Sequence, residues 1–375
     1  MNKFFSLEPA IDPNNRISFL LDWEITRKCN LDCSYCGTGV NGGHDNSTRH
    51  PKKNDCVQAI DFMFSYVDEY MNTKPNGIKH VIMNVYGGES LHHPDIVEIL
   101  MAVRQKYLRF KDRWHLTLTT TTNAIISNNK LLEILPLIDE FTVSYHTENT
   151  KKQKALFREN LLSIKARGRR QKCVVLMHEE PTLFKDAEDM IAWLVQHDIK
   201  FLPRQLDRPV HLEDSTGVYD TRQMIWFNKL YNSRNHNAVT ELSSTAEESK
   251  LTNIGRSCCG GRQVCLDQKY KQRHSFVDNH FPNWYCSVNH FFLYIKQVTG
   301  EIFVNKDCKM NFDGSIGPIG HLTESASMIE RLRNDLATQT LPVIQCKKSR
   351  CLCGLCAPKS KTLEGYHDIM DKYLA

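Results

Sequence analysis

The sequence Phe19-Leu-Leu-Asp-Trp-Glu-Ile-Thr26, followed by Cys29-Asn-Leu-Asp-Cys33-Ser-Tyr-Cys36, decides the fold of this chain. The first part is a mainly apolar run of strand length, and the cysteines follow in the loop after it. Three thiols this close together do not suit a disulfide framework, but they suit three corners of a 4Fe–4S cluster. The fourth iron atom would then be open to a small chelating molecule. Ferredoxin and zinc-ribbon motifs differ, because they use paired cysteines and supply four ligands.

Downstream of this loop, helical apolar stripes alternate with short β-like runs. The predicted strands are 19–26, 81–86, 114–122, 140–145, 173–177 and 200–205, and the predicted helices are 55–71, 96–103, 128–135, 157–168, 187–194 and 219–232. This repeated βα unit predicts a parallel sheet. It fits either a doubly wound sheet or a partial barrel, and periodicity alone does not choose between them. In both, ligands bind at the carboxyl ends of the strands.

The composition limits the class of protein. The chain has 375 residues, a formal net charge of +5 and 14 cysteines. The N-terminus has no signal peptide and no apolar run is long enough to span a membrane, so a cytoplasmic location is expected. Thiols stay reduced there, and clustered thiols indicate metal ligands rather than disulfides. The modest charge, without a Lys/Arg block, does not point to nucleic acid as a partner.

The cysteine motif resembles the CxxxCxxC signature of the radical S-adenosylmethionine (SAM) superfamily, with Tyr35 just before the last cysteine. The resemblance implies a partial (β/α)6 barrel of the α/β class. It also implies a 4Fe–4S cluster on Cys29, Cys33 and Cys36, whose open iron binds the amino and carboxylate groups of SAM. One electron from the cluster would break a carbon–sulfur bond of SAM, and the 5′-deoxyadenosyl radical would abstract a hydrogen atom from the substrate.

Residues at other strand ends fit the same superfamily. Gly87-Gly88-Glu89 looks like its GGE element: the glycines would permit close backbone approach to a ligand, and Glu89 would accept hydrogen bonds from the SAM ammonium group. The other candidates for SAM binding, each weighed against an ordinary polar strand end, are Asn123, Ser144 and Arg204. His146 and His178 also follow strands and are left open between a place facing the substrate and a structural role.

A second group of cysteines lies in the last third of the chain. Cys286 precedes a predicted hairpin (291–297 and 301–305, with Thr299-Gly300 at the turn) and Cys308 follows it, so the hairpin would bring the two thiols together. Further ligands would come from the cluster Cys346, Cys351, Cys353 and Cys356. The pattern resembles the SPASM/twitch extension, which carries auxiliary 4Fe–4S clusters. Two departures, the seven residues between Gly300 and Cys308 and the missing CxxCxxxxxCxxxC run, favour one cluster over two. A structural zinc site is the alternative.

The segment Gly255-Arg-Ser-Cys258-Cys259-Gly260-Gly261-Arg262, with Cys265 nearby, has three open interpretations. Arginines among glycines can form an anion pocket for a substrate carboxylate or phosphate. The cysteines can instead ligate a second auxiliary cluster. The third interpretation is a tight glycine turn with buried thiols.

These patterns predict a core domain at 1–234, a connecting segment at 235–254 and an auxiliary cluster domain at 255–375 with a C-terminal helix. The predicted function is a radical SAM oxidoreductase or modifying enzyme that uses an external electron donor such as flavodoxin or ferredoxin. The substrate is expected to be a small polar or anionic metabolite, because the short segment before residue 19 argues against a fused peptide-recognition domain. The alternatives are a SPASM-type maturase of peptide or protein side chains and a non-enzymatic iron–sulfur or zinc protein. An RNA substrate is disfavoured.

Overall fold

A computed structural model describes residues 11–12, 16–36, 44–73, 79–206, 219–232, 282–306, 308–347 and 359–374. The strands in these segments are β1 (Ile11–Asp12), β2 (Arg16–Thr26), β3 (Lys79–Gly87), β4 (His115–Thr122), β5 (Glu140–Tyr145), β6 (Arg170–Met177), β7 (Phe201–Gln205), β8 (Tyr285–Cys286), β9 (Phe292–Lys296), β10 (Glu301–Phe303), β11 (Gly320–His321), β12 (Ile344–Gln345) and β13 (Lys359–Ser360). The α-helices are α1 (Lys53–Asn72), α2 (Ile96–Tyr107), α3 (Asn128–Ile134), α4 (Lys151–Ala166), α5 (Pro181–Gln196), α6 (Thr221–Asn232), α8 (Ser325–Ala337) and α9 (Leu363–Leu374).

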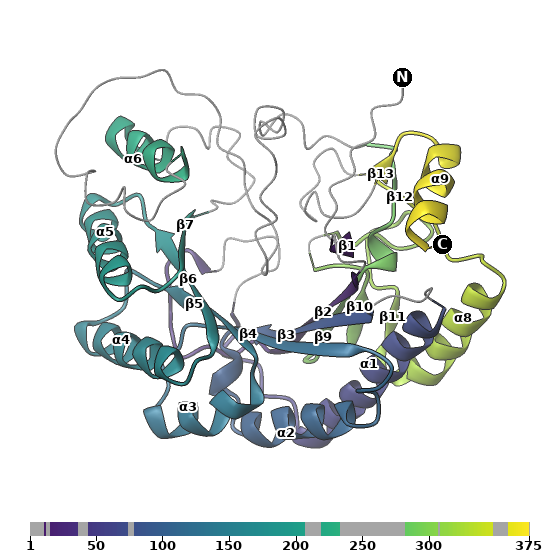
Figure 1. The fold of residues 1–375 in the computed structure, drawn as a ribbon, viewed down its shortest axis with the longest axis horizontal. Helices are drawn as coiled ribbons and strands as arrows, with labels where there is room; N and C mark the ends of the chain where they lie inside the picture. Colours follow the sequence, from purple (N-terminus) through teal and green to yellow (C-terminus); the bar gives the residue numbers. More distant parts are fainter. Residues whose placement is uncertain are drawn as a thin grey trace.

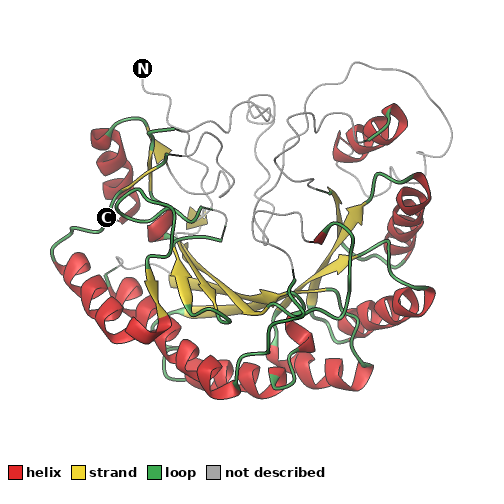
Figure 2. Cartoon of the chain, turned by 180° about the vertical axis from the view of Figure 1, so that it is seen from behind, coloured by secondary structure: helices red, strands yellow, loops and turns green. Residues whose placement is uncertain are grey.

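The main sheet has the strand order β11-β10-β9-β2-β3-β4-β5-β6-β7. Strands β2 to β7 are parallel and stand in sequence order. Each right-handed crossover therefore places its helix on the same side of the sheet. Figures 1 and 2 show helices α1 to α5 along the outer side of the curved sheet. This arrangement is a partial barrel, as predicted, and it excludes a doubly wound sheet.

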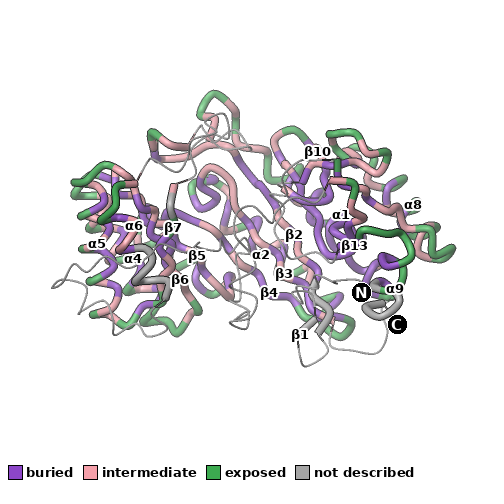
Figure 3. The backbone as a smooth tube through the Cα atoms, turned by 90° about the horizontal axis from the view of Figure 1, so that it is seen from above, coloured by how far each residue is buried: buried purple, intermediate pink, exposed green. Residues whose placement is uncertain are grey.

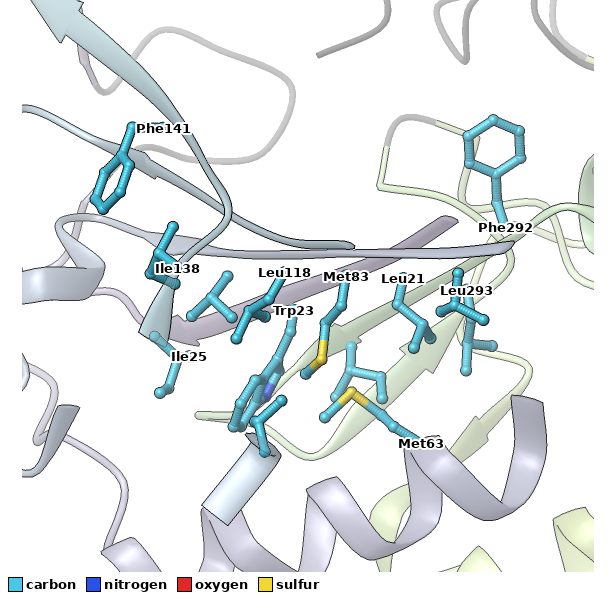
Figure 4. Packing of buried hydrophobic residues seen from close by; sticks show 14 of the residues in the cluster. Leu21, Trp23, Ile25, Met63, Met83, Leu118, Ile138, Phe141, Phe292 and Leu293 are labelled. Carbon is cyan, nitrogen blue, oxygen red and sulfur yellow. The ribbon is translucent and has the colours of Figure 1, made fainter. Parts of the chain in front are cut away.

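Alternation along β2 separates the two faces of the sheet. Leu21, Trp23 and Ile25 are at most 2% exposed and pack toward helix α1 (Figure 4). The residues between them, including Asp22 and Glu24, face the inner side of the curve. Buried residues concentrate on the strands and on the helix faces that cover them (Figure 3). The outer face is thus the apolar core, and the inner face is free to carry polar chemistry.

The predicted hairpin forms as β9 and β10, with Gly300 at φ +75 in its turn. Its first strand pairs in parallel with β2, so this late segment extends the core sheet. Helix α8, which sequence periodicity missed, packs against α1 at this end of the molecule. A separate three-stranded sheet has the order β12-β8-β13. The proposed division of the chain into domains stays a prediction.

Local signals explain where several helices begin and end. Thr150 and Gln153 form a capping box at the start of α4. Gly168, two residues beyond the end of that helix, has φ +65, a conformation that favours glycine. Helix α3 is followed directly by a 3-10 turn, Leu135–Leu137, which contains Pro136. Within the described segments, no helix is long and apolar enough to cross a membrane.

Candidate functional site

The three cysteines of the first motif lie in the loop after β2, at the carboxyl edge of the parallel strands. Each is half-buried and none is in a disulfide. Burial is the main cause that raises the pKa of the Cys29 thiol to about 11 and that of Cys33 to about 12, and the charge of Cys36 contributes in the same direction. Metal binding would displace the protons that this burial retains.

The donor set fits an iron–sulfur cluster in kind. Besides the three thiols, the backbone N–H of Leu31 donates to Cys29 Sγ at 3.4 Å, the type of hydrogen bond that tunes cluster sulfurs. Among the described residues, no three His, Cys, Asp or Glu side chains are grouped as ligands of one metal ion. In a cluster, by contrast, each thiolate binds an iron atom of its own. The assignment of Cys29, Cys33 and Cys36 to a cluster stays a prediction.

Side chains from the loop after β5 hold the second half of the cysteine loop. His146 Nδ1 lies 3.3 Å from Cys33 Sγ and 2.7 Å from the hydroxyl of Tyr35. Glu148 accepts hydrogen bonds from the backbone N–H of Ser34, at 2.8 Å, and from the Ser34 hydroxyl. Burial lowers the pKa of His146 to about 4, so its ring is neutral at pH 7. His146 thus contacts the cysteine loop through both Cys33 and Tyr35.

Asn123 holds the first half of the same loop. Its side-chain N–H groups donate to Asn30 Oδ1 at 2.8 Å and, weakly, to Cys29 Sγ at 3.8 Å. Asn30 in turn donates to the backbone carbonyl of Ile125 at 2.7 Å. Asn46 accepts a hydrogen bond from the backbone N–H of Cys29 at 2.9 Å. Asn123 thus contacts the cysteine loop, and its predicted contact with SAM stays a prediction.

Glu89 is 1% exposed and its carboxylate is used within the protein. It accepts hydrogen bonds from the Thr122 hydroxyl at 2.7 Å, from the Leu91 N–H at 2.9 Å and from the Asn123 N–H at 2.6 Å. Burial raises its pKa, against the lowering effect of these bonds. Glu89 therefore connects the second strand end to Asn123 and, through it, to the cysteine loop. The contact of Glu89 with the ammonium group of SAM stays a prediction.

Gly87 and Gly88 are required by the neighbouring backbone. A Cβ on Gly87 would lie 2.1 Å from the carbonyl oxygen of Thr26, and one on Gly88 would lie 2.4 Å from that of Lys28. The backbones also bond directly: Gly88 N–H donates to Thr26 O at 2.9 Å, and Glu89 N–H donates to Lys28 O at 2.8 Å. The close approach that these glycines allow is thus made to the segment that leads into the cysteines.

The other predicted residues fall into two groups. Ser144, half-buried, and Arg204, exposed, lie at the same carboxyl edge, in β5 and β7. Cys286, Cys308 and Cys346 are only 3–5% exposed. Strand β8, which contains Cys286, pairs with β12, and Cys346 N–H just beyond it donates to Trp284 O at 2.8 Å. Six further cysteines, all named above, lie outside the described residues: Cys258, Cys259, Cys265, Cys351, Cys353 and Cys356.

Sequence reasoning missed Asn30, Asn46 and Glu148 as supports of the cysteine loop. Asn30 stands inside the motif itself, and Glu148 lies three residues beyond the end of β5, where polar residues carry little signal. His178 Nε2 lies 3.6 Å from Glu148 Oε1. His146 therefore contacts the cysteine loop directly, and His178 contacts Glu148, which holds that loop. The contact of Glu148 with Ser34 joins residues 114 apart in the chain, and that of Asn30 with Ile125 joins residues 95 apart, so no local pattern encodes them.

The fold is shared with solved structures. A histidine-tagged form of anSMEcpe with bound AdoMet (AdoMet is SAM), a SPASM-domain radical SAM enzyme, superposes with a TM-score of 0.50 at 11% identity, over 96% of each chain. A second, "Native anSMEcpe with bound AdoMet and Cp18Cys peptide", has a TM-score of 0.49 at 11% identity, over 95% of this chain and 96% of that one. No family model and no curated protein matches the sequence. At the level of the fold, the resemblance to radical SAM proteins is confirmed.

Proposed function

We propose that this chain, which has the fold of a radical SAM enzyme, is itself one. With a 4Fe–4S cluster on Cys29, Cys33 and Cys36, it would cleave SAM reductively to a 5′-deoxyadenosyl radical, which takes a hydrogen atom from a C–H bond of the substrate. The observation that carries this proposal is the position of three half-buried thiols in one loop at the carboxyl edge of the sheet. Ligands of parallel α/β folds bind at that edge.

The chain's own residues would set the geometry of the reaction. Glu89 holds Asn123, and Asn123 holds Asn30 and Cys29, so the first cysteine is positioned by a continuous series of hydrogen bonds. Glu148 and His146 fix the other end of the loop. A buried hydrogen-bond network in which every polar group has a partner keeps a site rigid. We propose that Tyr35, Gly87, Gly88, Glu89, Asn123, Ser144 and Arg204 line the SAM site.

The substrate is proposed to be a small polar or anionic metabolite. A basic side chain on the inner face of β6 supports an anionic group. Lys172 is half-buried, and burial lowers its pKa, against the raising effect of the Glu140 charge. A half-buried lysine is stabilised when an anion binds beside it.

The reaction also needs electrons from outside and, in this proposal, an auxiliary 4Fe–4S cluster. Flavodoxin or ferredoxin would supply the electron. The buried thiols Cys286, Cys308 and Cys346, together with Cys351, Cys353 and Cys356, are the proposed auxiliary ligands. A cluster with four cysteine ligands leaves no iron open, which favours electron transfer over substrate binding.

The test is anaerobic. The protein is reconstituted with iron and sulfide, mixed with SAM and dithionite, and assayed for 5′-deoxyadenosine, while iron is counted in the same sample. We expect 5′-deoxyadenosine and about eight iron atoms per chain for two 4Fe–4S clusters, or about four if only the first forms. Zinc in place of iron, with no 5′-deoxyadenosine, would leave a non-enzymatic metal protein and refute the proposal.

A further inference from the structure

Glu24, on the inner face of β2, has a buried carboxylate of which one oxygen accepts a hydrogen bond and the other, in the segments that the structure describes, does not. The side chain is 8% exposed. Its Oε2 accepts a hydrogen bond from the Tyr294 hydroxyl at 2.7 Å, whereas Oε1 is buried and has no hydrogen-bond partner among the described residues. A buried carboxylate oxygen without a partner is costly, and native structures rarely keep one without a reason. The SAM site described above does not use this residue.

A second carboxylate and two tyrosine rings lie beside it. Asp22, two residues earlier on the same face, is half-buried and accepts a hydrogen bond from Asn84 at 3.2 Å. Tyr86 of β3 is in register with Glu24, and Tyr294 of β9 is in register with Asp22. The two rings stack with centroids 6.3 Å apart and planes at 21°. Carboxylates next to aromatic faces are the chemistry that binds organic cations.

Two lysines near these acids are directed to other partners. Lys296 stands opposite Glu24 on β9, but its ammonium group lies 3.7 Å from Glu301 and 5.2 Å from the Phe303 ring. Lys306 places its ammonium group 5.6 Å from the centre of the Tyr86 ring. Within the described residues, neither lysine forms an ion pair with Glu24 or Asp22. The position of Lys306 shows that the Tyr86 face accepts a cation.

We infer that Glu24 and Asp22, with Tyr86 and Tyr294, bind a cationic group of the substrate, either a primary ammonium or a guanidinium. The inference rests on the proposed function, because it assigns one end of that enzyme's substrate. Glu24 Oε1 would accept the hydrogen bond that it lacks, the Tyr86 ring would contact the cation, and Tyr294, fully buried between the Tyr86 and Phe303 rings, would hold Glu24 through its hydroxyl. Together with Lys172 on β6, this makes the substrate a molecule with groups of both charges.

The experiment measures binding and requires no turnover. Reconstituted protein is titrated anaerobically with n-butylammonium and n-butylguanidinium as cation probes, and with N-butylurea as a neutral probe of similar shape. We expect Glu24→Gln to weaken binding of the cations by about tenfold or more, since a hydrogen bond to a charged group is lost. Glu159→Gln, which removes the same charge from an exposed site on α4, leaves the Kd unchanged.

Several outcomes would overturn the inference: no cation probe binding to the wild-type protein, equal binding by Glu24→Gln, or equal binding of N-butylurea. The SAM ammonium group is another possible source of a cation, so SAM affinity is measured on the same samples. A loss of SAM affinity in Glu24→Gln, with probe binding unchanged, would assign the carboxylate to SAM. Because the 5′-deoxyadenosine assay is independent of these titrations, the proposed function can stand when this inference fails.

A second variant and a stability measurement guard against misfolding. Asp22→Asn, at the more exposed carboxylate, is expected to weaken the cation probes less than Glu24→Gln does. The unfolding temperature of Glu24→Gln is expected to stay equal or to rise, because an unpaired buried charge is replaced by an amide whose oxygen still accepts from Tyr294. A fall of several degrees would show that Glu24 serves the stability of the fold, and the inference would be withdrawn.

Discussion

The two groups of cysteines occupy contrasting surroundings. Cys29, Cys33 and Cys36 are half-buried at the carboxyl edge of the sheet, where Asn123, His146 and Glu148 hold their loop through hydrogen bonds. The described cysteines of the second group, Cys286, Cys308 and Cys346, are 3–5% exposed. The first environment suits a cluster that must accept an outside ligand, and the second suits one that is closed to it.

The largest expected effect tests the first group. Cys33→Ala removes a thiol that the proposed cluster needs, so 5′-deoxyadenosine formation is expected to fall to background in the anaerobic assay. Cys173→Ala is the matched control, because Cys173 is a fully buried core cysteine outside both groups. The contrast between the groups is lost if Cys33→Ala still cleaves SAM.

The second prediction concerns the buried group. Cys308→Ala is expected to lose about four iron atoms per chain, those of one 4Fe–4S cluster. SAM cleavage in the absence of substrate is expected to persist, because the first loop is untouched. Iron analysis and the 5′-deoxyadenosine assay on the same sample measure both effects, with Cys56→Ala in helix α1 as the control. A full complement of iron in Cys308→Ala would remove this residue from any cluster.

A smaller effect tests the network that supports the first group. Glu89→Gln would place its amide N–H group against the backbone N–H of either Asn123 or Leu91, so at least one buried hydrogen bond is lost. We expect the free energy of unfolding to fall by about 1–3 kcal/mol in denaturant titration. SAM cleavage is expected to slow because Asn123 loosens its hold on Cys29. The exposed control Glu159→Gln is expected to change stability by less than about 0.5 kcal/mol.

The smallest effect is a pH dependence at the same edge. Burial, followed by the charges of His93 and His92, lowers the pKa of His50 to about 4 from an ordinary value of 6.5. Its Nδ1 lies 2.9 Å from the Thr26 hydroxyl. As the pH falls from 7 to 5, the unfolded chain takes up a proton that the folded chain refuses, so stability decreases. His50→Gln is expected to make that decrease shallower.

The check is chemical unfolding of wild type, His50→Gln and the exposed control His115→Gln between pH 7 and 5. Only His50→Gln is expected to alter the slope of stability against pH. Parallel curves for all three proteins would show that His50 does not contribute to acid destabilisation.

Sequence patterns predicted the elements of the core closely because each pattern is local. The strand predicted at 140–145 is β5 to the residue, and the helix predicted at 55–71 is α1 with two residues added before it and one after it. The short β8, β11, β12 and β13 and the helix α8 were not predicted. Strands of two residues carry no periodicity, and they exist only because neighbouring segments pair with them.

The sequence by itself determined the order of βα units, the cysteine loop at the end of the first strand, and the Gly87-Gly88-Glu89 turn at the end of the second. Spacing within one short segment is enough for each of these. Only the tertiary structure decided that β9 pairs with β2, that Glu148 and His146 hold the cysteine loop, and that one oxygen of Glu24 lacks a partner in the described part of the chain. These features are contacts between segments that are distant in the chain, and such contacts are determined by tertiary packing rather than by local sequence preference.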